Sequence, residues 1–99
     1  MADRKLKPIH PGEVLQEEFL KPFNLEADEL AQNISVDAKN INEIITGKQS
    51  ITADLALRLS KYFGTSAQFW LGLQSDYDLD VTREKLGDKL EKEIVPIAA

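Results

Sequence analysis

The sequence has no cysteine and only one histidine among its 99 residues. The lack of cysteine excludes a disulfide framework, a thiol nucleophile and every cysteine-based zinc or iron–sulfur site. The single histidine, His10, excludes a cluster of imidazoles around a metal ion. No apolar run approaches the roughly 18–20 residues of a membrane span. We therefore expect no metal, no cofactor and no membrane partner.

The chain is also short and acidic. Its length is typical of one small domain, which has little room for a deep enclosed pocket. No nucleophile lies beside a base in the sequence, so we expect no catalytic residue and no enzyme. The start of the chain is charged but has no apolar segment behind it, which is not typical of a secretory signal. We expect a protein of the cytoplasm.

The net charge of −5 argues against nucleic acid as a partner. Residues 26–51 and 76–99 each carry a net charge of −3, and no segment forms a strong basic stripe. If the chain binds DNA, the electrostatic contribution of each subunit is modest.

Apolar residues recur at the three- and four-residue spacing of amphipathic helices, and no strand-like alternation appears. The sequence therefore predicts an all-α fold. The predicted helices cover residues 11–21, 26–33, 37 or 38–46, 52–63, a helix from about 66, and 81–94.

Two short helices, a three-residue turn and a third helix form the middle of this pattern, which is helix-turn-helix spacing. Ala31 is small enough for two helices to cross closely, and Val36 fills the gap after the turn. Ile41 and Ile44 pack the third helix onto the second. The polar residues between them are then directed outward, where such a helix enters the major groove of DNA.

Several motifs, taken together and in order, resemble one family. They are HPGEVLQEEFL at 10–20, INEIITGK at 41–48, SITADLALRLS at 50–60, FGTSAQFWLGLQ at 63–74 and YDL at 77–79. The chain resembles the short HigA antitoxins, also called the VapI group, within the Xre/Cro-C1 helix-turn-helix superfamily. The resemblance covers about seventy residues.

This resemblance implies a five-helix lambda-repressor-like DNA-binding domain with an additional C-terminal helical segment. The expected division is an N-terminal arm at 1–9, the helix-turn-helix domain at 10–80 and a helical extension at 81–99. The implied function is that of an antitoxin in a type II toxin–antitoxin system. Such a protein neutralises a small RelE-like mRNA-interferase toxin and represses its own operon as a homodimer on double-stranded operator DNA.

The resemblance also implies which residues contact DNA, because the first turns of the third helix read bases in this superfamily. Asn pairs with adenine, Lys with guanine and Glu with cytosine, whereas alanine offers only a methyl contact to thymine. Residues beyond that helix would line the phosphate backbone, where contacts position the protein. The expected base-facing residues are Ala38, Lys39, Asn42 and Glu43, and Asn40 is expected to reach either a base or the backbone. The expected backbone-facing residues are Thr46, Lys48, Gln49 and Ser50.

Three positions depart from the superfamily pattern. Ser35 stands in the turn where glycine is common, and a positive φ there costs serine about 1 kcal/mol or more. Asn40 and Gln49 stand where basic residues are common. Two alternatives therefore stay open: a stand-alone Xre-family repressor without a toxin, and a protein–protein module that has lost DNA binding.

Other residues are expected to have structural roles. His10 is expected at a helix boundary and Trp70 in the core, where its indole N–H needs a partner. A capping box is expected at Thr65 to Gln68. The stripe of Leu86, Leu90 and Ile94 either folds back on the domain or serves a dimer or toxin contact, and Arg4, Lys5 and Lys7 form a weak basic arm.

Overall fold

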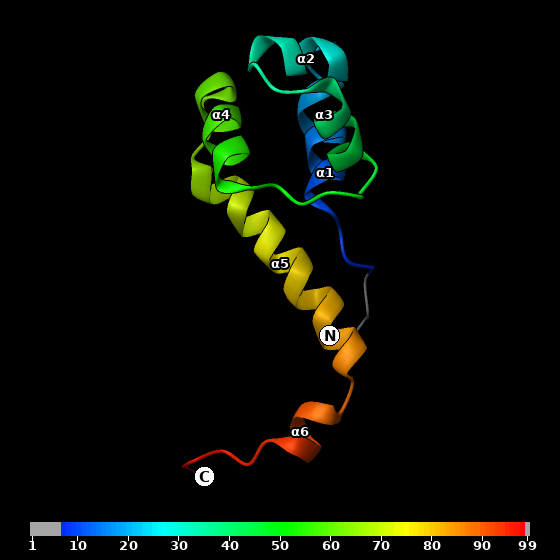
Figure 1. Cartoon of the computed structure of the whole chain (residues 1–99), viewed down its shortest axis with the longest axis vertical. Helices are drawn as coiled ribbons and strands as arrows, with labels where there is room; N and C mark the ends of the chain where they lie inside the picture. Colours follow the sequence, from blue (N-terminus) through cyan, green and yellow to red (C-terminus); the bar gives the residue numbers. More distant parts are fainter. Residues whose placement is uncertain (1–6, 99) are drawn as a thin grey trace.

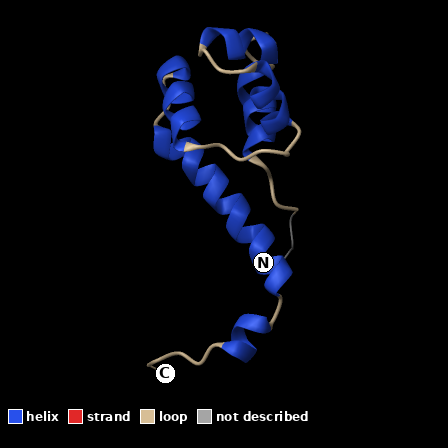
Figure 2. Ribbon diagram, in the orientation of Figure 1, coloured by secondary structure: helices blue, strands red, loops and turns tan. Residues whose placement is uncertain are grey.

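The structure is a computed structural model that describes residues 7–98. Within that range all regular structure is helical, and no residue from 7 to 98 lies in a strand (Figure 2). The prediction of an all-α fold is confirmed. The elements are α1 (Pro11–Val14), the π-helix η1 (Leu15–Leu20), α2 (Ala27–Asn33), α3 (Ala38–Ile45), α4 (Ala53–Phe63), α5 (Ala67–Leu86) and α6 (Lys89–Glu93).

The first helices form a cluster, and α5 leads away from it (Figure 1). α2 packs on α3, α1 packs on both α3 and α5, and α4 packs on α5. The molecule measures 51 × 26 × 23 Å along its principal axes, and the long dimension comes from the far part of α5 and from α6. The fold is thus a helical head, which contains the helix-turn-helix unit, with a projecting C-terminal arm.

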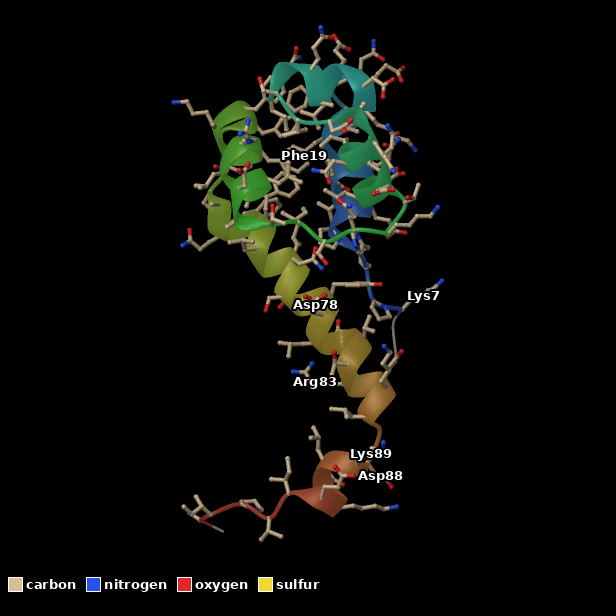
Figure 3. The ribbon with its side chains drawn as sticks, in the orientation of Figure 1. Lys7, Phe19, Asp78, Arg83, Asp88 and Lys89 are labelled. Atoms are coloured by element: carbon tan, nitrogen blue, oxygen red, sulfur yellow. The ribbon has the colours of Figure 1, made fainter. Side chains whose placement is uncertain are left out.

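The core of the head is apolar and contains the one tryptophan. Trp70 is fully buried, and its indole N–H donates a hydrogen bond of 2.8 Å to Oγ1 of Thr65. Phe19 points from η1 toward this group (Figure 3), and its ring centroid lies 4.9 Å from the rings of both Phe63 and Trp70. The remaining buried apolar side chains include Leu15, Leu20, Leu30, Ile41, Ile44, Ile51, Leu55 and Leu59.

Side chains cap the starts of α3, α4 and α5, and one of these caps corrects a prediction. The Asp37 and Thr52 side chains accept hydrogen bonds from the first turns of α3 and α4. The cap of α5, however, is Ser66, whose hydroxyl accepts from the N–H of Phe69 at 3.0 Å. The capping box predicted from Thr65 is wrong, because the Thr65 hydroxyl accepts from the buried indole instead.

The helix predicted at 11–21 consists of an α-helical segment followed by a π-helical segment. α1 is α-helical, whereas residues 15–20 form a π-helix, with the Lys21 N–H bonded to the Gln16 carbonyl at 3.0 Å. Both Leu15 and Leu20 are fully buried. Residues five apart point in different directions on an α-helix. The wider π winding brings them closer to one side, so that both reach the core.

The C-terminal part of the chain differs from the prediction. A helix beginning at residue 81 is wrong, because α5 continues without a break to Leu86 and ends at Gly87, where φ is +56°. No residue of α6 is buried. Leu90 and Ile94 are 45% and 58% exposed, so the stripe does not fold back on the domain.

The basic arm lies mostly beyond the described range. Arg4 and Lys5 fall outside the described residues, and Lys7 is exposed. Between residues 7 and 98, no helix has both the length and the apolar character needed to cross a membrane.

Candidate nucleic-acid interface

α3 has one buried face and one exposed face. Ile41 and Ile44 are fully buried against the core. Lys39, Asn42 and Thr46 are exposed on the other side. The helix therefore presents a polar face to solvent at the position where a recognition helix is expected.

The other predicted residues of α3 are less accessible. Asn40 and Glu43 are half-buried. Ala38 is also half-buried and packs against the core, which leaves little of its methyl group for a contact with thymine.

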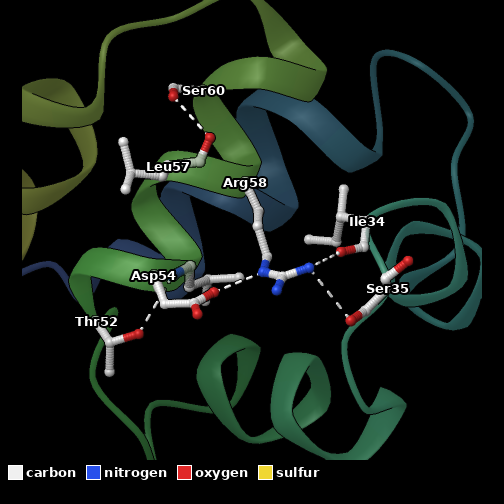
Figure 4. Close-up of polar contacts among 8 residues, drawn as sticks. Ile34, Ser35, Thr52, Asp54, Leu57, Arg58 and Ser60 are labelled. Carbon is white, nitrogen blue, oxygen red and sulfur yellow. Dashed lines mark hydrogen bonds and ion pairs between the residues drawn. The ribbon is translucent and has the colours of Figure 1, made fainter.

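The turn between α2 and α3 has a strained residue and a bracing side chain. Ser35 has a φ of +61°, so serine adopts the conformation for which glycine is favoured. Arg58 of α4 reaches this turn (Figure 4) and donates to the carbonyl oxygens of Ile34 at 2.8 Å and Ser35 at 3.4 Å. Arg58 also pairs with Asp54 one turn before it on α4. The turn is thus held from α4 although its own sequence lacks the glycine.

Asn42 and Thr46 form hydrogen bonds within the domain. The Asn42 amide nitrogen donates to Oδ1 of Asp28 at 3.2 Å and to the Ala38 carbonyl at 2.8 Å. The Thr46 hydroxyl donates to the carbonyls of Asn42 and Glu43, at 3.0 and 3.2 Å. Both side chains therefore keep an oxygen, rather than a proton, free toward solvent.

The loop after α3 carries the residues expected at the phosphate backbone. Lys48, Gln49 and Ser50 are all exposed. The backbone N–H groups of Lys48 and Gln49 both donate to the Glu43 carbonyl, at 2.7 and 3.2 Å, and close the end of α3. Contacts from Lys48 and Gln49 to phosphate would accordingly come from their side chains.

A buried glutamine fixes the far end of this loop. Gln74 of α5 is only 6% exposed, and its Oε1 accepts from the Ile51 N–H at 2.8 Å. Its Nε2 donates to Oδ1 of Asp78 at 3.0 Å. Because a buried N–H without a partner costs about 1–3 kcal/mol, this pair ties the loop to α5.

His10 joins three parts of the interface. Its Nδ1 accepts from the Gly12 N–H at 2.9 Å and caps α1, which confirms the predicted boundary role. Its ring meets Tyr77 of α5 edge to face, with centroids 4.8 Å apart. Burial lowers the pKa of His10 below its ordinary 6.5, although the Gln49 backbone and the charges of Asp78 and Glu13 act in the opposite direction.

Gly12 allows α1 to approach α3 closely. A Cβ at this position would lie 2.7 Å from the carbonyl carbon of Ile44 and 2.9 Å from Cα of Ile45, and closer still to the Ile44 carbonyl oxygen. The glycine is therefore required by the packing of α1 on the C-terminal half of α3.

Acidic side chains flank the polar face of α3. A shallow pocket beside Asn42 is lined by Glu26, Asp28 and Glu29 from the start of α2. Lys39 and Lys48, both exposed, are the two basic residues among residues 38–50. Any contact with DNA is therefore made by few charges, and its specificity depends on hydrogen bonds.

Sequence reasoning missed four residues of this site: Gly12, Asp28, Arg58 and Gln74. Gly12, Arg58 and Gln74 stand inside recognised motifs, but nothing in the motifs indicates the partner that each one touches. Asp28 and Arg58 lie 14 and 24 residues from the groups they bind, and no local spacing could reveal that.

Among residues 7–98, no group of three or more histidine, aspartate or glutamate side chains is placed to hold a metal ion.

The chain is similar to known helix-turn-helix proteins. The family model described as Helix-turn-helix (HTH_3) matches residues 17–70. Virulence-associated protein I of Dichelobacter nodosus is 49% identical over 80 residues, which cover 81% of this chain and 74% of that protein.

Two solved structures from Pseudomonas aeruginosa are similar along nearly the whole chain. PA4674 in complex with its 18-bp operator DNA has a TM-score of 0.91 and 44% identity, over 96% of this chain and 100% of that one. The antitoxin HigA with the higBA promoter has a TM-score of 0.88 and 45% identity, over 92% and 99% of the two chains. The lambda-repressor-like fold expected from the sequence is confirmed.

Proposed function

This chain belongs to the helix-turn-helix family, among the VapI and HigA proteins, and from that membership we propose that it is the antitoxin of a type II toxin–antitoxin system. In this role it binds and neutralises a small RelE-like toxin that cleaves mRNA. It also represses its own operon by binding operator DNA. Its action is stoichiometric rather than enzymatic, and it takes place in the cytoplasm.

The observation that carries this proposal is the two-sided character of α3. Its apolar side is fully buried at Ile41 and Ile44, while its polar side projects Lys39 and Asn42 into solvent. Two relatives of 44–45% identity have been solved with operator or promoter DNA. A polar recognition helix held rigidly by the core is the feature that such binding requires.

We assign the contacts by position. Residues near the start of α3 meet base edges, and those at its end and in the following loop meet phosphates. The half-buried Ala38 contributes at most a methyl contact. The base-facing set is Ala38, Lys39, Asn42 and Glu43, with Asn40 at a base or at the backbone. The backbone-facing set is Thr46, Lys48, Gln49 and Ser50.

The repressor acts as a homodimer in this proposal. Two copies place their α3 helices in successive major grooves, about 34 Å apart, on a palindromic operator. Apolar side chains along the C-terminal arm are exposed in the single chain and are available to contact the second copy or the toxin. Those more than two-fifths exposed are Leu79, Leu90, Ile94, Val95 and Ile97.

DNA binding is tested by fluorescence anisotropy with the duplex upstream of the gene and a scrambled duplex of the same composition. We expect selective binding that weakens from about 50 to about 200 mM salt, because phosphate contacts release counterions. Equal binding to both duplexes, or binding to neither, would contradict the repressor role.

The antitoxin role is tested with the product of the neighbouring gene. We expect the two proteins to co-purify, and the chain to prevent mRNA cleavage at equimolar concentration. A toxin that stays active in the presence of excess chain would refute this role and leave a stand-alone repressor.

A further inference from the structure

Both N–H groups of the Asn42 side chain are hydrogen-bonded within the domain in the absence of DNA. A side-chain amide has two N–H groups and one carbonyl oxygen. Its Nδ2 donates to Oδ1 of Asp28 at 3.2 Å and to the Ala38 carbonyl at 2.8 Å. The oxygen Oδ1 is then the group of this exposed side chain that remains free for a ligand.

The contact with Asp28 arises from how α2 and α3 cross. Ala31, which is 1% exposed, allows close packing of the two helices. The Val36 N–H donates to the Ala31 carbonyl at 2.9 Å and fixes the turn between them. The first turn of α2 therefore lies beside the middle of α3, where the Asp28 carboxylate faces the Asn42 amide.

We propose that Asp28 is a positioning residue that sets the base preference of Asn42 by making its side chain an acceptor only. This inference rests on the proposed function, because it requires α3 to lie in the major groove. An asparagine that reads adenine in the bidentate mode must donate to N7 while it accepts from N6. With both N–H groups already used, Asn42 accepts one amino proton and donates none.

The chemistry of the groove then defines the base that fits. Adenine and cytosine each present an amino group there, on N6 and N4, whereas guanine O6 and thymine O4 are acceptors. An acceptor-only Asn42 takes adenine or cytosine on the strand it faces and excludes guanine and thymine. Adenine and cytosine are then bound with similar affinity, since each supplies one hydrogen bond.

The test is selection of binding sites from randomised duplexes by the full chain and three variants. Asp28→Ala removes the charge and the acceptor, whereas Asp28→Asn removes the charge and keeps an acceptor oxygen. Glu29→Ala removes a charge from the same turn, and within residues 7–98 the Glu29 side chain makes no hydrogen bond to Asn42. The three variants thus separate the loss of charge from the loss of the contact.

We expect the wild-type chain, Asp28→Asn and Glu29→Ala to select adenine or cytosine alike at one position. Asp28→Ala frees one N–H of Asn42, so that a bidentate contact forms and adenine becomes favoured over cytosine by about tenfold. Asn42→Ala should remove the preference at that position and so identify it. Thermal unfolding followed by circular dichroism checks that every variant is folded.

Two results would overturn the inference while leaving the proposed function intact. The first is an unchanged preference in Asp28→Ala, with overall affinity altered as in Glu29→Ala, because the acid would then act only through its charge. The second is selective binding in which no position responds to Asn42→Ala. An absence of selectivity in the wild-type chain would instead refute the repressor role, on which the inference depends.

Discussion

Gly12→Ala should strongly destabilise the fold, because α1 and α3 leave no room for a methyl group between them. Ordinary contacts of a Cβ begin at 3.4 Å, whereas this one would stand 2.7 and 2.9 Å from backbone atoms of Ile44 and Ile45. Backbone atoms at a helix crossing cannot turn aside as a flexible side chain does. α1 would have to withdraw from α3 by more than about 1 Å, which opens the core beside Leu15.

The expected cost is at the upper end of overpacking effects, about 3 kcal/mol. A domain of this size loses about 4–8 °C in Tm for each kcal/mol, so the midpoint should fall by about 12–24 °C. Operator affinity should also fall at temperatures where the variant is still folded, because α3 has lost the support of α1.

Gly72→Ala is the matched control, since it makes the same change on the exposed side of α5. A Cβ at Gly72 has no neighbouring atom within 4 Å. Alanine in a helix interior is favoured over glycine by about 1 kcal/mol, so the Tm should rise by about 4–8 °C. Thermal unfolding by circular dichroism measures both variants, and a Tm of Gly12→Ala at or above that of the wild type would refute the reasoning.

Three further predictions concern single side chains. The free energy of unfolding should decrease as the pH falls through 6.5, because the pKa of His10 is lower in the folded chain than in the unfolded chain, so the unfolded state binds more protons. Urea titrations at pH 7.5 and 5.5 measure this decrease. The variant His10→Gln should lack the decrease that begins at pH 6.5. Thr65→Val should cost about 1–3 kcal/mol in urea unfolding, because the buried indole of Trp70 loses its acceptor; a loss no greater than that of an exposed substitution would count against the hydrogen bond. Lys48→Ala should reduce the slope of log binding constant against log salt concentration by about one unit for all DNA sequences, whereas Lys39→Ala should change the base preference. An unchanged operator affinity in both variants would show that α3 is not the recognition helix.

The recognition unit could be predicted from the sequence because its signals are local. Asp37 caps α3, apolar residues repeat at three- and four-residue spacing, and Ile41 and Ile44 accordingly lie in the core. The residues that hold this unit in place could not be predicted. Arg58 reaches Ile34 across 24 residues, and which carbonyl a long side chain meets is decided by tertiary packing.

The start of α5 agrees with the helix predicted from about residue 66, but its full length escaped prediction for a different reason. Beyond Gln74 its residues are mostly exposed, so the apolar periodicity that indicates a helix is missing. The alternating aspartates at 76, 78 and 80 are also poor helix formers. Yet no glycine or proline interrupts residues 73–86, and the helix continues until Gly87 ends it.

Because α5 is unbroken, it fixes the orientation of the C-terminal arm relative to the helical head. Gln74 anchors the helix to Ile51 in the loop that follows α3, and Leu86 stands twelve residues further on, about 18 Å along the same axis. Each inserted residue would turn everything beyond it by about 100°, and seven would be needed to bring it back to within about 20° of its original direction. The number of residues between Gln74 and Gly87 therefore sets the direction in which the arm leaves the helical head. A partner bound to the exposed apolar side chains of the arm, as proposed above, would take its orientation relative to α3 from that number.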